Sequence, residues 1–211
     1  MKCADPNDCK IASELARTAS VVLHPFLLPS WMMTVLLCGD TAFALYPPRF
    51  KFYLGWVVAL YTLLIPLLAI GLLKSAGRLR SWRLDDRSDR VLPLVIGTLC
   101  YVACAVTVGR IASAEIIRRI MLAAACCEIV CLAVNYRWKI SLHMTAMGGC
   151  VAVLTVLCFV TGHLTGLLAA AVACAGLLAS SRLWLGKHSP AQVAAGFCCG
   201  FAVTASMLVL L

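Results

Sequence analysis

Seven long apolar segments, separated by short polar stretches, set the strongest limit on how this chain can fold. Each approaches the roughly 20 apolar residues that an α-helix needs to cross the hydrocarbon core of a bilayer. The segments are Val21–Leu37, Phe52–Leu73, Val91–Val108, Ile120–Tyr136, Leu142–Val160, Leu164–Ser180 and Pro190–Leu211. Pro25 and Pro29 interrupt the first of them, which is therefore expected to be kinked or partly re-entrant. The sequence therefore predicts an all-α, polytopic transmembrane bundle of about six to seven spans, forming a single membrane domain over residues 1–211.

Composition supports this prediction and limits the partners. Of the 211 residues, 63% are hydrophobic and 13% are charged, whereas soluble domains have about 45–50% apolar and about 25% charged residues. The net charge of +9 suits anionic lipid headgroups or anionic substrates. Because the basic stretches carry no known nucleic-acid motif, we expect membrane lipids as partners and no nucleic acid.

Most of the cysteines lie inside apolar segments, where we expect them to pack as small hydrophobic side chains and not as a disulfide framework. Ten of the 13 are of this kind: Cys100, Cys104, Cys126, Cys127, Cys131, Cys150, Cys158, Cys174, Cys198 and Cys199. Their spacing relative to histidine does not match a zinc site. The N-terminus lacks a cleavable signal-peptide pattern, so the first span is expected to be retained.

Three polar segments are predicted to emerge on one side of the membrane. They are Lys74–Arg90, Arg137–Lys139 and Ser181–His188. An even number of crossings separates each from the next, so segments scattered along the chain meet at one face. These segments and the adjoining helix starts contain Arg83, Arg90, Ser141, His143, Arg182 and His188.

The residue types gathered at this face fit the chemistry of phosphate. Arginine binds phosphate oxygens in a bidentate manner, and histidine serves as a nucleophile or a general acid near neutral pH. Ser141 and His143 open a predicted helix, whose N-terminal N–H groups favour an anion. The combination points to phosphoryl transfer from a lipid.

At these residues the sequence resembles the signature of the type 2 phosphatidic acid phosphatases and vanadium haloperoxidases, in their bacterial integral-membrane lipid phosphatase branch. The first family motif is Lys, six residues and Arg-Pro. Here Arg83 and Arg90 keep the spacing, with Arg in place of Lys, and Pro93 comes two residues late. The second motif, Pro-Ser-Gly-His, keeps only Ser141 and His143.

The third motif is the most specific match. The family has Ser-Arg, five residues, His, three residues and Asp. This chain has Ser181, Arg182 and His188 at that spacing, and Gln192 replaces the Asp. The resemblance covers about residues 83–200.

The resemblance implies a role for each matched residue. His188 would attack phosphorus and form a phosphohistidine, and His143 would protonate the leaving alcohol. The phosphate oxygens would be held by three arginines and two serines, namely Arg83, Arg90, Arg182, Ser141 and Ser181. The family mechanism needs no metal and no cofactor, because guanidinium groups hold the phosphate.

Among the differences from the family motifs, Gln192 in place of Asp has the largest consequence for the expected mechanism. A Gln carbonyl still accepts a hydrogen bond from a histidine ring, but it carries no charge to stabilise an imidazolium. Glu128, inside the fourth span, is either a substitute charge or a polar contact between helices, since an intramembrane carboxyl usually faces a cavity or a partner. His24 and His163 are expected to have structural and interfacial roles.

The sequence therefore predicts an integral-membrane phosphatase that acts on a lipid phosphomonoester or diphosphate. Two alternatives stay open: a lipid phosphotransferase of the same fold, and a non-catalytic protein that binds or transports lipid phosphates, which the Gln192 departure favours. The substrate lipid and homo-oligomer formation also stay open.

The bacterial inner membrane is the predicted location, since the layout resembles bacterial members. The side away from the site holds Arg49, Lys51, Arg110, Arg118 and Arg119, which leaves 13 of the 18 Lys and Arg residues on the site side. By the positive-inside rule the active site is expected to face the cytoplasm.

Overall fold

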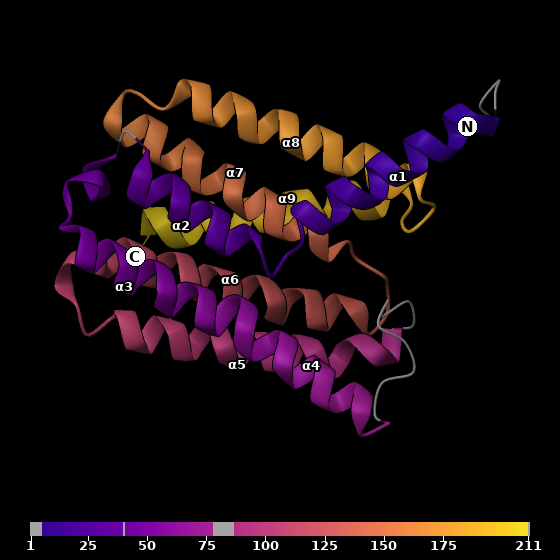
Figure 1. Ribbon diagram of the computed structural model, residues 1–211, viewed down its shortest axis with the longest axis horizontal. Coiled ribbons are helices and arrows are strands. Elements are labelled where there is room, and N and C mark those ends of the chain that lie inside the picture. The colour runs from indigo at the N-terminus through magenta and orange to yellow at the C-terminus, as the bar shows by residue number, and fades with distance from the viewer. Residues whose placement is uncertain (1–5, 40, 78–86, 211) are drawn as a thin grey trace.

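Helices make up the regular structure of the part of the chain that the computed structural model describes, residues 6–39, 41–77 and 87–210 (Figure 1). The α-helices are α1 (Pro6–Val22), α2 (Leu28–Cys38), α3 (Pro48–Ala59), α4 (Ile65–Ser75), α5 (Arg87–Val108), α6 (Glu115–Asn135), α7 (Leu142–Thr161), α8 (Thr165–Trp184) and α9 (Pro190–Leu210). Short segments η1 (Ala42–Leu45), η2 (Leu60–Leu64) and η3 (Ala112–Ala114) join some of them. The all-α prediction is confirmed.

Within those ranges, five helical stretches are long and apolar enough to cross a membrane, which identifies a helical membrane protein. They are Pro48–Ser75, Val91–Val108, Leu142–Thr161, Thr165–Trp184 and Pro190–Leu210. The predicted fourth span differs from these because its helix, α6, begins at Glu115 and also carries Arg118, Arg119 and Glu128. Its apolar part lies against α5 in the bundle (Figure 1).

The predicted first span is two helices. α1 ends at Val22 and α2 begins at Leu28, with a turn between them. Pro25 causes the break, because its ring excludes the helical hydrogen bond and restricts the preceding residue. Pro29 fits the first turn of α2, where an N–H has no helical partner. The polar helix α1 thus precedes a short apolar helix.

The second predicted span is continuous from Pro48 to Ser75 but changes its winding halfway. α3 passes through η2, a π-helical segment, into α4. Pro66 lies one residue after the start of α4 and has no N–H to donate to the preceding turn. The wider winding of η2 accommodates that proline without ending the helix.

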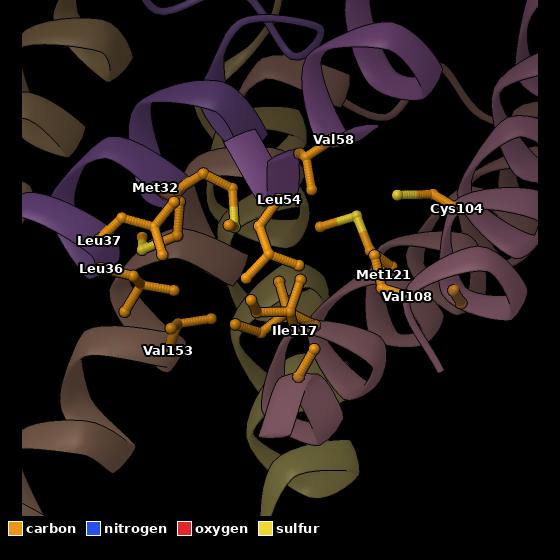
Figure 2. Packing of buried hydrophobic residues seen from close by; sticks show 14 of the residues in the cluster. Met32, Leu36, Leu37, Leu54, Val58, Cys104, Val108, Ile117, Met121 and Val153 are labelled. Atoms are coloured by element: carbon orange, nitrogen blue, oxygen red, sulfur yellow. The ribbon is translucent and has the colours of Figure 1, made fainter. Parts of the chain in front are cut away.

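An apolar core fills the space between α2, α3, α5, α6 and α7 (Figure 2). Leu36, Leu54, Cys104, Val108 and Ile117 in this core are fully buried. The ten cysteines placed in apolar segments are all free thiols, as predicted. We call the cluster of buried side chains between these five helices the apolar core.

Glycines let α7 and α9 approach until their backbones touch. A Cβ on Gly148 would collide with the backbone of Phe197, and one on Gly200 would collide with the backbone of Thr145. A Cβ on Gly196 would lie 2.6 Å from the carbonyl oxygen of Ser141. The predicted small-residue contact is therefore present, and it holds the start of α7 against the first turns of α9.

The arrangement of the helices brings the predicted polar segments together. The end of α4, the start of α5, and the α6–α7 and α8–α9 connections lie at the same end of the bundle, at the right in Figure 1. The α2–α3, α5–α6 and α7–α8 connections lie at the opposite end. The crossing parity used in the sequence prediction is confirmed.

Candidate functional site

A cavity of about 280 Å³ opens between the helices and is lined by both apolar and charged side chains. Arg90 of α5, His143 of α7, Arg182 of α8 and His188 of the α8–α9 connection all line it. The predicted convergence of these four residues is therefore observed. Ser141, which was also predicted to line the cavity, does not, and Arg83 lies outside the described residues.

The α8–α9 connection turns sharply to bring His188 to the cavity. α8 ends at Trp184, and Gly186 follows with a φ of +62°. That left-handed conformation suits glycine, because it carries no Cβ. The turn reverses the chain, so that Arg182 before it and His188 after it reach the same cavity.

Gln192 holds the His188 ring and caps α9 at the same time. Its side-chain oxygen lies 3.1 Å from Nδ1 of His188 and accepts the Ser189 N–H at 3.1 Å. The Ser189 hydroxyl in turn accepts the Gln192 N–H at 3.3 Å. This reciprocal pair is a capping box, with Pro190 at the first helical position. The predicted contact of Gln192 with His188 is present, and the capping role is an addition.

These contacts determine which ring nitrogen of His188 carries the proton. Because the Gln192 oxygen can only accept, Nδ1 of His188 must donate, which leaves Nε2 with its lone pair. Burial lowers the pKa of His188 from 6.5 to about 4, against the opposing hydrogen bond to Gln192 and with help from the charges of Arg182, Arg90 and Lys139. The ring is therefore neutral at pH 7 and carries a nucleophilic nitrogen.

His143 is held by the first helix of the chain. Its Nε2 lies 3.1 Å from the carbonyl oxygen of Ser20, in the last turn of α1. The last carbonyls of a helix have no partner within it, so the end of α1 at Val22 leaves this oxygen available. Since the carbonyl accepts, Nε2 of His143 carries a proton, and Nδ1 is the nitrogen left for other chemistry.

Arg90 of α5 reaches the start of α7, where Ser141 lies. A guanidinium nitrogen of Arg90 donates to the carbonyl oxygen of Ile140 at 3.4 Å, so this buried arginine joins α5 to the α6–α7 connection. Ser141 occupies the N-cap of α7, yet its hydroxyl makes no capping bond. That hydroxyl is fully buried and has no hydrogen-bond partner among the described residues. It is the one predicted serine with unused hydrogen-bonding capacity.

Ser181 was predicted to hold a phosphate oxygen, but its hydroxyl bonds to the backbone of its own helix. Its hydroxyl donates to the carbonyl oxygen of Leu177 at 2.8 Å, one turn back in α8, and Ser181 does not line the cavity. A serine within a helix often makes this backward bond. The neighbouring Arg182 does line the cavity, so the two halves of the Ser-Arg pair differ in their access to it.

Glu128 lies in the wall of the same cavity, between α5 and α6. Its carboxylate accepts the Thr98 hydroxyl at 3.3 Å. It also lies against Gly97, where an added Cβ would be 2.5 Å from one carboxylate oxygen. Of the two predicted roles, the polar contact between helices is the one with an observed partner.

His24 is the cavity residue that the sequence prediction missed, since a structural role was expected for it. It lies in the turn between α1 and α2, lines the cavity, and packs edge-on against His143 with ring centroids 5.2 Å apart. The available signal was a His-Pro pair at a helix break on the predicted site side. Comparisons of this chain with protein-family models, curated proteins and solved structures found no match.

Proposed function

We propose that this protein is an integral-membrane lipid phosphatase that forms a phosphohistidine on His188. The observation that carries the proposal is the pairing of a neutral His188, held at Nδ1 by Gln192 at 3.1 Å, with Arg90, Arg182 and His143 around one cavity. A neutral imidazole beside guanidinium groups suits attack on a phosphate, because the arginines hold its charged oxygens.

In the first step, Nε2 of His188 attacks phosphorus and the bond from phosphorus to the lipid oxygen breaks. For this step His143 carries a second proton on Nδ1 in addition to the one on Nε2, and it gives the Nδ1 proton to that oxygen as the alcohol leaves. In the second step, Nδ1 of His143 takes a proton from water as the water oxygen attacks phosphorus, the phosphorus–nitrogen bond breaks, and inorganic phosphate leaves. The Gln192 carbonyl holds the ring throughout, and the arginines stabilise the charge on the equatorial oxygens.

The cavity supports a lipid as the bearer of the phosphate. Besides the charged residues, it is lined by apolar side chains of several helices, including Leu28, Met32, Leu67, Ile70 and Leu94. A polar phosphate end and an apolar wall match an amphiphile. We further propose a bacterial inner-membrane location with this end of the bundle in the cytoplasm, on the basis of the excess of Lys and Arg at this end.

Phosphate release from defined lipids tests the function. Purified protein in mixed micelles would be given phosphatidate, a lysophosphatidate, a sphingoid phosphate and a polyprenyl diphosphate in turn. We expect release of inorganic phosphate from at least one lipid, and its loss in His188→Ala. Binding of all these lipids without any release would overturn the proposal and support the non-catalytic alternative.

The phosphotransferase alternative has its own result. A transferase would release little phosphate with water alone and would label an added lipid alcohol or sugar acceptor from a ³²P-labelled donor. Labelling of the acceptor that greatly exceeds release to water would replace hydrolysis with transfer. The His188→Ala control applies equally, since both reactions begin at the same nitrogen.

A further inference from the structure

The turn between α1 and α2 places a third imidazole in the cavity, outside the three motif segments. His24 follows the end of α1, and Pro25 prevents the helix from continuing. The carbonyl oxygen of His24 accepts the N–H groups of Leu27 at 2.8 Å and Leu28 at 3.0 Å. These bonds close the turn and fix the backbone from which the His24 ring projects.

The contacts of the ring define its tautomer. Nδ1 of His24 accepts the Phe26 N–H at 3.3 Å, so the proton of the neutral ring is on Nε2. The ring packs between Phe26, with centroids 5.1 Å apart, and His143, with centroids 5.2 Å apart and planes at 83°. His24 thus brings a hydrogen-bond donor to the cavity without needing a positive charge.

The position of His24 relative to His143 indicates which oxygen it would meet. In phosphoryl transfer the attacking and leaving atoms lie roughly in line on opposite sides of phosphorus. His188 is the proposed nucleophile and His143 the proposed acid for the leaving oxygen. Since His24 packs directly against His143, it belongs to the leaving-group side.

His143 alone offers few hydrogen-bond donors to the leaving oxygen. Its Nε2 proton is held by the Ser20 carbonyl, so only Nδ1 is left, and Nδ1 carries a proton only in the cationic ring. After Nδ1 has given up its proton it cannot donate again. A second, neutral donor beside it would stabilise the negative charge that develops on an alcohol oxygen.

We propose that His24 is a further catalytic residue, which donates a hydrogen bond from Nε2 to the leaving oxygen of the lipid phosphate. The proposal rests on the proposed phosphatase function and deepens it. It predicts that His24 matters for phosphate esters of alkyl alcohols, whose alkoxides are poor leaving groups. It matters little for an aryl ester such as p-nitrophenyl phosphate, whose leaving group needs no proton.

The test compares the two substrates in full-length protein. We expect His24→Ala to lower kcat/KM for phosphatidate about 100-fold, the loss typical of one oxyanion donor, and to change kcat/KM for p-nitrophenyl phosphate by less than about threefold. His163→Ala is the matched control, because His163 is exposed in the α7–α8 turn at the opposite end of the bundle. It should leave both values unchanged.

Two more variants keep the test decisive if His24→Ala fails to fold. His24→Phe keeps a ring against His143 and lacks the donor, so it should show the same selective loss. His24→Gln restores an N–H donor and should recover part of the phosphatidate activity. Equal losses on both substrates, or none, would overturn the role of His24 while leaving the phosphatase function intact. A wild-type protein that releases phosphate from none of the lipids in the panel would overturn both.

Discussion

The two ends of the bundle are built from different kinds of residue. At one end the apolar core joins α2, α3, α5, α6 and α7 through side chains such as Leu36, Leu54 and Ile117, all fully buried (Figure 2). At the other end, arginines and histidines line a cavity. The cavity reaches into the core, where Met32, Met121 and Val153 line it, but its arginines and histidines lie at the site end.

This difference implies a division between stability and chemistry. Side chains that fill space contribute to the free energy of unfolding, whereas a cavity lined by Arg90, Arg182 and histidines contributes little packing and desolvates charged groups at a cost. Substitutions at the core should therefore change stability, and substitutions at the site should change turnover. The four predictions below test that division.

The largest effect is expected at the proposed nucleophile. His188→Ala should lower phosphate release by at least about 10⁴-fold, because the proposed phosphoenzyme forms on the nitrogen that this substitution removes. The temperature of unfolding should stay near that of the wild type. Phosphate release and thermal unfolding in the same detergent measure the two quantities. Wild-type turnover by a folded His188→Ala protein would refute the mechanism.

Leu36→Ala should show the opposite pattern. Leu36 is fully buried in the apolar core, and removing such a side chain costs about 2–5 kcal/mol of the free energy of unfolding. Turnover per folded molecule should not change. The control is Leu72→Ala in α4, because Leu72 is 69% exposed on the outside of the bundle. Equal destabilisation by both variants would show that Leu36 does not pack as described.

A substitution at the contact between α7 and α9 should change both the stability and the turnover of the protein. Gly200→Ala would push a methyl group into the backbone of Thr145, at a cost of about 1–3 kcal/mol for an overpacked contact. It should also lower turnover, because it displaces the turn of α7 that carries His143. Gly176→Ala is the matched control, since nothing lies within 4 Å of a Cβ there. Chemical denaturation and phosphate release should separate the two variants.

The smallest effect concerns the pH profile of His188. The folded ring has a pKa lowered to about 4, so His188 stays neutral and nucleophilic until the pH falls near 4. A carboxylate favours the protonated ring, so Gln192→Asp should move this acid limb of kcat/KM to higher pH, with turnover at pH 8 preserved or raised. Ionisation of the substrate contributes equally to both profiles, and their difference is the measured quantity.

The same pKa shift has a consequence for stability. An unfolded His188 takes up a proton near pH 6.5, whereas the folded ring resists it until about pH 4. Its contribution therefore favours unfolding as the pH falls from 6.5 towards 4.

The pH profile has its own contradicting outcome. An acid limb of kcat/KM that does not move in Gln192→Asp would show that Gln192 does not act on the charge of the His188 ring.

Much of the fold followed from the sequence because lipid imposes a simple length and polarity rule on each span. Prolines and charged residues explain how two of the spans depart from that rule. The first span is broken at Pro25, as its prolines predicted. The predicted fourth span is part of a longer helix whose first turns carry Glu115, Arg118 and Arg119.

The candidate site was predictable where spacing along one segment determined it. The turn at Gly186 brings Arg182 and His188 together as their separation suggested, and Gln192 reaches His188 across one helical turn. His24 was not predictable in this way, because its contact with His143 joins residues far apart in the sequence. The backward bond of Ser181 also depends on a side-chain rotation that a motif does not encode.

Trapping the phosphoenzyme tests the central claim most directly. Protein mixed rapidly with ³²P-labelled phosphatidate, or with the lipid that the panel identifies, would be quenched with alkaline denaturant, and the labelled peptide would be mapped. The account predicts label on His188, stable to alkali and lost in acid as expected of a phosphoimidazole, and no label in His188→Ala. Phosphate release without a labelled protein, or label on any other residue, would contradict it.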